Sequence, residues 1–149
     1  MELEVIDYGP LDEALIKVET PITLFAGANN TGKTFLSRTL HAIVRSFRRA
    51  GAYRDLLPAY LCDDIWADKS DLRCLIKSGR ERAVIKFKAK GFNLEITIPS
   101  SPEEDINLEA QGTLSETNSI YIPAARRGFI SLDRFTRIGV IHLAFPYLE

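Results

Sequence analysis

The stretch that decides the fold is ITLFAGANNTGKTFLSRTLHAIV, residues 22–44. Its first five residues form a short apolar run, which is typical of a buried strand. From Leu36 to Phe47, apolar side chains recur at helical spacing, so we expect a helix that ends near Ala50. Between them, residues 27–34 read GANNTGKT and match the pattern G-x-x-x-x-G-K-[ST] at every position. The sequence therefore predicts a strand, a phosphate-binding loop and a helix in direct succession.

Each position of this loop has a physical role in holding phosphate. Gly27 allows the chain to turn off the strand, and Gly32 lets backbone N–H groups approach phosphate oxygens. The helix that begins near Lys33 adds the positive end of its dipole. The Lys33 ammonium can reach the β- and γ-phosphates, and the Thr34 hydroxyl can ligate Mg²⁺. The predicted nucleotide-binding residues are Gly27, Asn29, Asn30, Thr31, Gly32, Lys33, Thr34 and Phe35, with Thr34 as the metal ligand. A glycine-rich turn without a ligand is the alternative.

Length and composition are those of one globular domain. The chain has 149 residues, of which 46% are hydrophobic and 26% charged, so we expect a single nucleotide-binding domain over residues 1–149. Its formal net charge of −1 gives no global electrostatic case for nucleic acid or an anionic membrane. No apolar run approaches the roughly 20 residues that span a bilayer, and residues 1–9 do not resemble a signal peptide. We therefore expect a cytoplasmic protein with no membrane partner. Cys62 and Cys74 are interpreted as ordinary buried thiols rather than as a disulfide bridge.

The remaining elements follow from alternation and turn signals. Residues 3–8 and 14–18 are predicted to form two short strands separated by Gly9-Pro10. Residues 83–99 are predicted to form a hairpin with Lys90-Gly91 at its turn, and Lys86 and Lys88 facing Glu95 on the wet side. The other predictions are a helix over residues 56–65, a further turn of helix over 72–76, a polar loop over 100–118, a strand over 119–122 and a mixture of helix and strand over 129–145.

Two segments resemble a known family. Residues 5–43, VIDYGPLDEALIKVETPITLFAGANNTGKTFLSRTLHAI, resemble the start of prokaryotic ABC-like AAA-family ATPases, which are relatives of the RecF, structural-maintenance-of-chromosomes and overcoming-lysogenization-defect groups. Residues 121–128, YIPAARRG, resemble that family's Y-[IL]-P-A-x-R segment. The resemblance implies an α/β fold of the ABC-type P-loop NTPase class, in which a central sheet around the loop's strand is joined by an antiparallel β layer. It also implies ATP and Mg²⁺ as cofactors, and a role in DNA maintenance or defence.

The family's catalytic motifs have no convincing counterpart in this chain. No apolar strand ends in an acidic pair, and no Leu-Ser-Gly-Gly-like signature occurs. Residues 59–64, AYLCDD, faintly resemble the acidic strand of a Walker B element, but solvated carboxylates at a helix end are the preferred interpretation. Gln111 precedes a predicted strand and is not assigned the family's metal-binding glutamine role. We therefore expect the N-terminal half of an ATPase head, with unknown catalytic residues and little hydrolysis on its own. Its partner would be a second copy or the missing C-terminal half.

Two other function classes stay open. One is a complete small P-loop kinase or NTPase, although the N-K-x-D element of GTPases is absent from the sequence. The other is a non-enzymatic module that binds nucleic acid or protein and keeps a vestigial loop, with Arg45, Arg48, Arg49 and Arg54 as its contact face. Cations that complement the end of a helix dipole are the preferred interpretation of these arginines. Arg126 and Arg127 suit phosphate contact or surface ion pairs equally, whereas His41 and His142 are interpreted as packed side chains.

Overall fold

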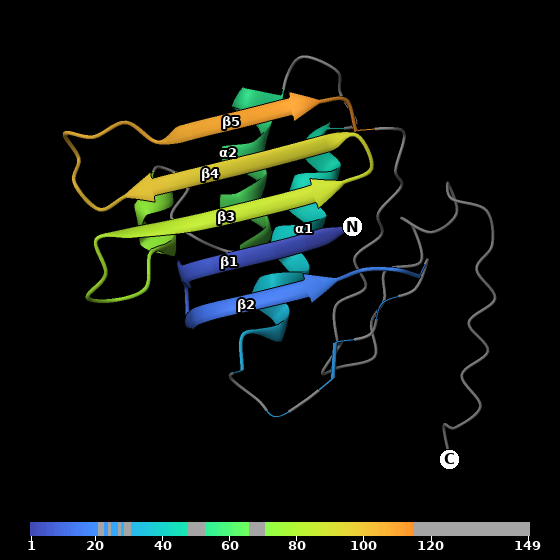
Figure 1. The fold of residues 1–149 in the computed structure, drawn as a ribbon. Coiled ribbons are helices and arrows are strands. Elements are labelled where there is room, and N and C mark those ends of the chain that lie inside the picture. Colours follow the sequence, from blue (N-terminus) through green and yellow to red (C-terminus); the bar gives the residue numbers. More distant parts are fainter. Residues whose placement is uncertain are drawn as a thin grey trace, which may run out of the picture.

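An antiparallel sheet carries two helices on one face (Figure 1). The computed structural model describes residues 1–20, 23, 25, 26, 28, 31–47, 53–65 and 71–114. The strands are β1 (Glu2–Tyr8), β2 (Leu11–Lys17), β3 (Arg82–Ala89), β4 (Phe92–Pro99) and β5 (Asn107–Gly112). The helices are α1 (Lys33–Phe47), α2 (Tyr53–Ile65) and a short 3-10 helix, η1 (Leu72–Leu75). Within this part of the chain the strand order is β2-β1-β3-β4-β5, and every neighbouring pair is antiparallel.

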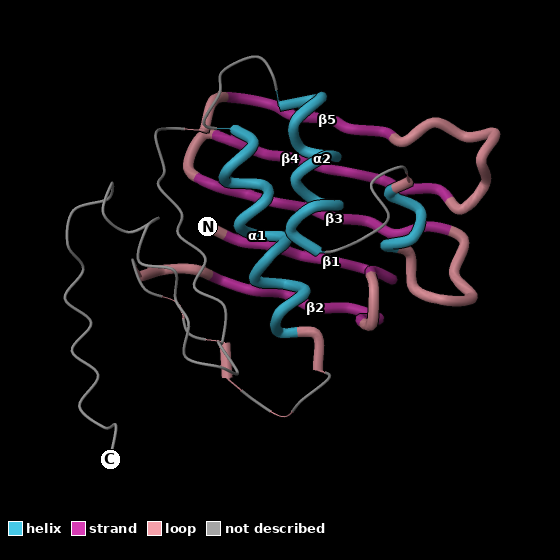
Figure 2. Tube along the Cα trace, turned by 180° about the vertical axis from the view of Figure 1, so that it is seen from behind, coloured by secondary structure: helices cyan, strands magenta, loops and turns pink. Residues whose placement is uncertain are grey.

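The core lies between the sheet and the two helices. Figure 2, seen from behind, shows α1 and α2 crossing that face of the sheet. Alternate residues of each strand point toward the helices, because successive side chains of a strand face opposite sides. Leu3 lies opposite Phe87 on β3, and Ile85 lies opposite Ile96 on β4; all four side chains are buried. Burying each such side chain contributes about 1.5–3 kcal/mol, so this inner layer holds the sheet and helices together.

Helix α1 begins at Lys33, where the loop motif predicts it. In the first turn of the helix, the N–H of Leu36 donates a hydrogen bond to the backbone oxygen of Gly32 at 2.9 Å. One stripe of the helix is buried against the sheet and α2: Leu36, Thr39, Ala42, Ile43, Val44 and Ser46. The amphipathic pattern read from the sequence is therefore confirmed. The expected end near Ala50 lies outside the described residues.

The hairpin predicted over residues 83–99 is confirmed, and the two strands predicted on either side of Gly9-Pro10 also pair as a hairpin, the second beginning at Leu11 rather than Ala14. Strands β1 and β2 are joined by a tight turn in which Gly9 has a φ of +55°. Strands β3 and β4 are joined at Lys90-Gly91, where Gly91 has a φ of +74°, and Lys86 lies opposite Glu95 as expected. The ion pair that Lys86 makes, however, is with Glu4 on β1 at 3.5 Å. Strand β1 supplies this carboxylate because it pairs with β3 on the side away from β4.

Two sequence expectations are wrong within the described residues. Residues 100–118 are not a single loop, because residues 107–112 form β5. The half-buried Leu108 and Ala110 face the core, but two apolar positions among acidic ones are too weak a signal to predict a strand. The buried strand expected over residues 22–26 is not present at Thr23, Phe25 or Ala26, of which the first and last are exposed. A buried strand needs neighbours on both sides, and every strand of the described sheet comes from other segments.

The middle of the chain is helical, as expected. Residues 59–64 belong to α2, which excludes a Walker B strand at this place. Residues 72–75 form the 3-10 helix η1. The described part of the chain contains no helix that is long and apolar enough to cross a membrane. The expectations for residues 119–149, including residues 121–128, Arg126, Arg127 and His142, lie outside the described residues. The fold of the described part is thus mixed α/β with an antiparallel sheet.

Candidate functional site

The ammonium group of Lys33 bends back over the loop that precedes α1. It donates hydrogen bonds to the backbone oxygen of Ala28 and to Oγ1 of Thr31, the latter at 3.2 Å. Thr31 Oγ1 in turn donates to the same Ala28 oxygen at 3.0 Å. Gly27, Asn29 and Asn30 lie outside the described residues. In the described part of the loop, therefore, the cation is held by neutral oxygen acceptors, which are the kind of partner that phosphate oxygens could replace.

Gly32 occupies a position that strongly favours glycine. Its φ is +79°, and a Cβ atom built there would lie 2.5 Å from Cδ2 of Leu11. Leu11 is the first residue of β2, so the loop is pressed against the start of that strand. Without a side chain, Gly32 lets the chain turn into α1. It also leaves the backbone N–H groups at this turn accessible, because no Cβ atom covers them.

The first turn of α1 offers further groups to an anion. The opening N–H groups of a helix have no partner within the helix, and at Lys33, Thr34 and Phe35 they precede the bond made by Leu36 N. The side chain of Thr34 is exposed, and its carbonyl accepts a bond from Ser37 Oγ at 3.1 Å. The backbone N–H groups, the helix dipole and the Lys33 ammonium thus favour negative charge at one place.

The ring of Phe35 points away from this exposed side and packs on the first hairpin. Its centroid lies 4.8 Å from that of Tyr8 in an edge-to-face arrangement. A Cβ atom at Gly9 would lie 2.4 Å from two carbons of the Phe35 ring. Of the predicted binding residues, Phe35 therefore has its side chain committed to packing, and its N–H remains as the group that could contact a ligand.

A buried hydrogen-bond chain fixes the same turn of α1 to the sheet. Thr39 Oγ1 donates to Phe35 O at 2.9 Å and lies 3.1 Å from the Tyr8 hydroxyl. Because the single hydroxyl proton of Thr39 is used toward Phe35, Tyr8 is the donor of the second bond. Burial raises the pKa of Tyr8, so this phenol keeps the proton that it donates. Sequence reasoning missed Tyr8 and Gly9, because their contacts with α1 are long-range.

Charged side chains brace the other side of the first hairpin. Asp12 on β2 accepts from Lys77 Nζ at 2.6 Å and from Arg80 Nη2 at 3.2 Å, and these bonds lower the pKa of its carboxyl. Arg80 Nε also lies 3.0 Å from Asp7 Oδ1. The turn that supports Gly32 and Phe35 is therefore tied to residues 77–80, which precede β3.

The remaining predicted residues do not gather at this loop. The Arg45 guanidinium stacks over the ring of Tyr60 on α2, 4.1 Å from its centroid, and so joins the two helices. Arg54 is exposed at the start of α2, whereas Arg48 and Arg49 lie outside the described residues. Gln111 lies on β5, at the opposite edge of the sheet from β2. His41 lies on α1 and is half-buried.

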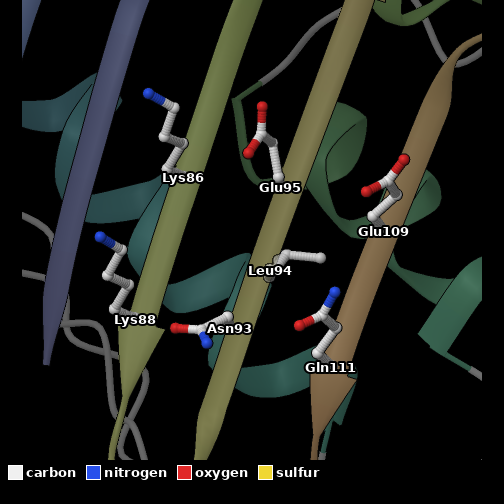
Figure 3. A pocket seen from close by; sticks show the side chains of 7 residues that line it. All are labelled: Lys86, Lys88, Asn93, Leu94, Glu95, Glu109 and Gln111. Atoms are coloured by element: carbon white, nitrogen blue, oxygen red, sulfur yellow. The ribbon is translucent and has the colours of Figure 1, made fainter.

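A hollow on the helix-free face of the sheet is the other candidate. It is lined by Lys86, Lys88, Asn93, Leu94, Glu95, Glu109 and Gln111, from β3, β4 and β5 (Figure 3). Its lysines lie on β3 and its glutamates on β4 and β5, and most of its polar side chains are exposed, which fits the wet sheet face predicted from the sequence. No group of three or more His, Cys, Asp or Glu side chains in the described part of the chain could hold a metal ion.

A scan against protein-family models and searches of the curated proteins and the solved structures find no match to this chain.

Proposed function

We propose that this chain binds a magnesium nucleoside triphosphate, ATP in the first place, through residues 27–34. The observation that carries the proposal is the position of Lys33. It is the first residue of α1, and its ammonium already lies over the preceding loop on exchangeable oxygen acceptors. A phosphate that displaced these acceptors would meet the ammonium, the free N–H groups of the first helical turn and the positive end of the dipole together.

Within this proposal, each remaining residue has a separate role. Gly32 provides the close backbone approach, and Leu11 beneath it holds the loop in place. The exposed hydroxyl of Thr34 would ligate Mg²⁺, with phosphate oxygens and water completing the shell, because Mg²⁺ is usually held by few protein groups. Gly27, Asn29 and Asn30 are proposed to complete the phosphate cradle through their backbone.

We further propose that the chain is part of an ABC-like ATPase that acts in DNA maintenance or defence. The support is the resemblance of residues 5–43, together with an antiparallel sheet that carries the loop's helix on one face. In this interpretation the sheet is the antiparallel layer of an ABC-type P-loop NTPase head. The head would pair with another head around ATP, and the chain alone would turn over little ATP, because phosphoryl transfer also needs a residue that orients the attacking water.

Calorimetric titration with Mg-ATP and Mg-GTP tests the nucleotide site. We expect Mg-ATP to bind the native chain and Lys33→Ala to weaken binding about 10- to 100-fold, because a charge-assisted hydrogen bond contributes about 1.5–3 kcal/mol. Lys90→Ala is the matched control, since Lys90 is an exposed lysine at the turn between β3 and β4. Equal affinities of the native chain and Lys33→Ala, or no binding by the native chain, would contradict the proposal.

A further inference from the structure

The outer edge of β2 is a surface that the proposed nucleotide site does not use. Within the described part of the chain, β2 is the first strand of the sheet and pairs with β1 alone. An edge strand presents N–H and C=O groups that can pair with another chain. Leu15, in the middle of β2, has 54% of its surface exposed and is one of two large hydrophobic side chains described as exposed. This edge therefore combines backbone pairing capacity with an apolar side chain in water.

The hydrogen-bond alternation of the β1–β2 hairpin shows which residues point outward. Met1 N donates to Val18 O, and Val18 N donates to Met1 O, both at 2.8 Å, so these two residues form a hydrogen-bonded pair. In an antiparallel ladder, hydrogen-bonded and non-bonded pairs alternate. The even-numbered residues of β2 therefore bond to β1. The N–H and C=O groups of Glu13, Leu15 and Lys17 point to the open edge.

We propose that β2 pairs with β2 of a second copy of this chain, antiparallel and about a two-fold axis at Leu15. In this register Leu15 lies opposite Leu15 of the second copy, and Glu13 lies opposite its Lys17. All three outward-pointing residues then fall in hydrogen-bonded pairs, each of which exchanges two backbone bonds. On the inner face, Ala14 lies opposite Ile16 of the second copy, which extends the apolar layer across the interface.

Charge and polarity favour this register over the one whose axis lies at Ala14. An axis at Ala14 also satisfies the backbone alternation, but it places the Glu13 carboxylate opposite Leu15 and leaves the Lys17 ammonium without an acidic partner across the interface. With the axis at Leu15, each dimer gains two Glu13–Lys17 pairs and one leucine pair. Opposite charges and apolar side chains directly across a strand pair both stabilise it. The Lys17 ammonium has room for a new partner, because its contact with Glu2 is long, at 3.9 Å, and 61% of its side chain is exposed.

Sedimentation velocity at increasing protein concentration tests the dimer without any nucleotide. An interface of one short strand per copy is small, so we expect a monomer–dimer equilibrium. Glu13→Lys alone and Lys17→Glu alone each place like charges opposite one another twice per dimer, and we expect each to weaken association about tenfold. An equimolar mixture of these two variants pairs lysine with glutamate at both places, so we expect it to dimerise about as well as the native chain. Lys90→Glu, away from this edge, is the control and should leave dimerisation unchanged.

Disulfide trapping tests the register itself. In a background of Cys74→Ser, which removes the exposed native thiol and leaves the buried Cys62, Leu15→Cys should form a covalent dimer on mild oxidation. The Cα atoms of a hydrogen-bonded antiparallel pair lie about 5.5 Å apart, within the reach of a disulfide. Glu13→Cys is the matched control: its position is equally exposed, but the two copies of residue 13 lie four residues out of register, so little cross-linking is expected.

Three results would overturn the proposal. The first is a monomer at every concentration, and protected amides at Glu13, Leu15 and Lys17 in that monomer would show that the chain covers this edge itself. The second is a native dimer that the charge variants and their mixture leave unchanged. The third is equal cross-linking of Leu15→Cys and Glu13→Cys.

Discussion

Gly9 and Gly32 each allow a close contact that a side chain at the same position would disturb. Gly32 lies against Leu11, and Gly9 lies against the ring of Phe35, so the loop and the first turn of α1 both rest on the first hairpin. The motif alone predicted Gly32, Lys33 and the start of the helix. It could not predict Gly9, because a glycine in a hairpin turn is already explained by its positive φ. The packing of the first hairpin against the loop and α1 could therefore be found only in the structure.

Replacing Gly9 separates backbone strain from steric conflict. Gly9 and Gly79 both have positive φ, of +55° and +81°, but a Cβ atom at Gly79 would meet nothing within 4 Å. We expect Gly79→Ala to cost about 1 kcal/mol of unfolding free energy from strain alone. Gly9→Ala should cost about 1–3 kcal/mol more, because the Phe35 ring must move. Urea denaturation measures both, and equal losses would show that the contact with Phe35 is unimportant.

The buried phenol of Tyr8 makes stability depend on pH in the alkaline range. Because the folded pKa of Tyr8 is raised while that of the unfolded chain stays near 10, its effect on stability is constant below about pH 10. Above that pH the unfolded chain alone loses the proton, so stability falls by about 1.4 kcal/mol per pH unit. Tyr8→Phe should lack this part of the decline, at a cost of about 1 kcal/mol near pH 7 for the lost bond to Thr39. Denaturation at several pH values checks it, and an unchanged slope would contradict it.

At the scale of elements, patterns that are complete within one segment were predicted correctly. The hairpin over residues 83–99 shows clean alternation on both strands and a glycine at its turn, and even the opposition of Lys86 and Glu95 was correct. Strand β5 was missed because its pairing with β4 supplies the stability that its own polar sequence does not indicate. The apolar run at residues 22–26 was overinterpreted for the opposite reason: hydrophobicity alone does not provide a neighbouring strand.

Arg73 joins two elements that the sequence does not relate. Its guanidinium donates to Ser101 O at 3.2 Å and to Glu104 O at 2.8 Å, so η1 holds the connection between β4 and β5. We expect Arg73→Lys to leave the fold intact, because Lys keeps the charge. Its single ammonium cannot make both bonds of the forked guanidinium, however, so the connection loses part of its support. Amide exchange at residues 101–106 should become faster in this variant, measured by hydrogen–deuterium exchange. Arg82→Lys, on the neighbouring β3, is the control, and equal protection of the connection in both variants would contradict the assignment.

At the scale of the whole molecule, the sheet is built from two separate parts of the chain. The hairpin of β1 and β2 lies beside β3, although α1, α2 and η1 intervene in sequence. Sequence patterns predicted the hairpin of β3 and β4 and the two strands of the first hairpin, but not that β1 lies between β2 and β3. That placement depends on matching the apolar faces of Leu3 and Val5 to those of Phe87 and Ile85. Such a match between distant segments has no local signature, and it also decides where α1 and its loop sit on the sheet.

The central place of β1 sets the order in which the nascent chain can fold. Met1, just before β1, is bonded to Val18, so the first hairpin can close soon after residues 1–18 have left the ribosome. The other side of β1 must then wait until β3 (Arg82–Ala89) has been synthesised, about 3–14 s later at 5–20 residues per second. Until another element packs on it, the inner face of the hairpin is exposed to solvent or to a chaperone. The helix that begins at Lys33 emerges during this wait and is the first structure able to cover that face.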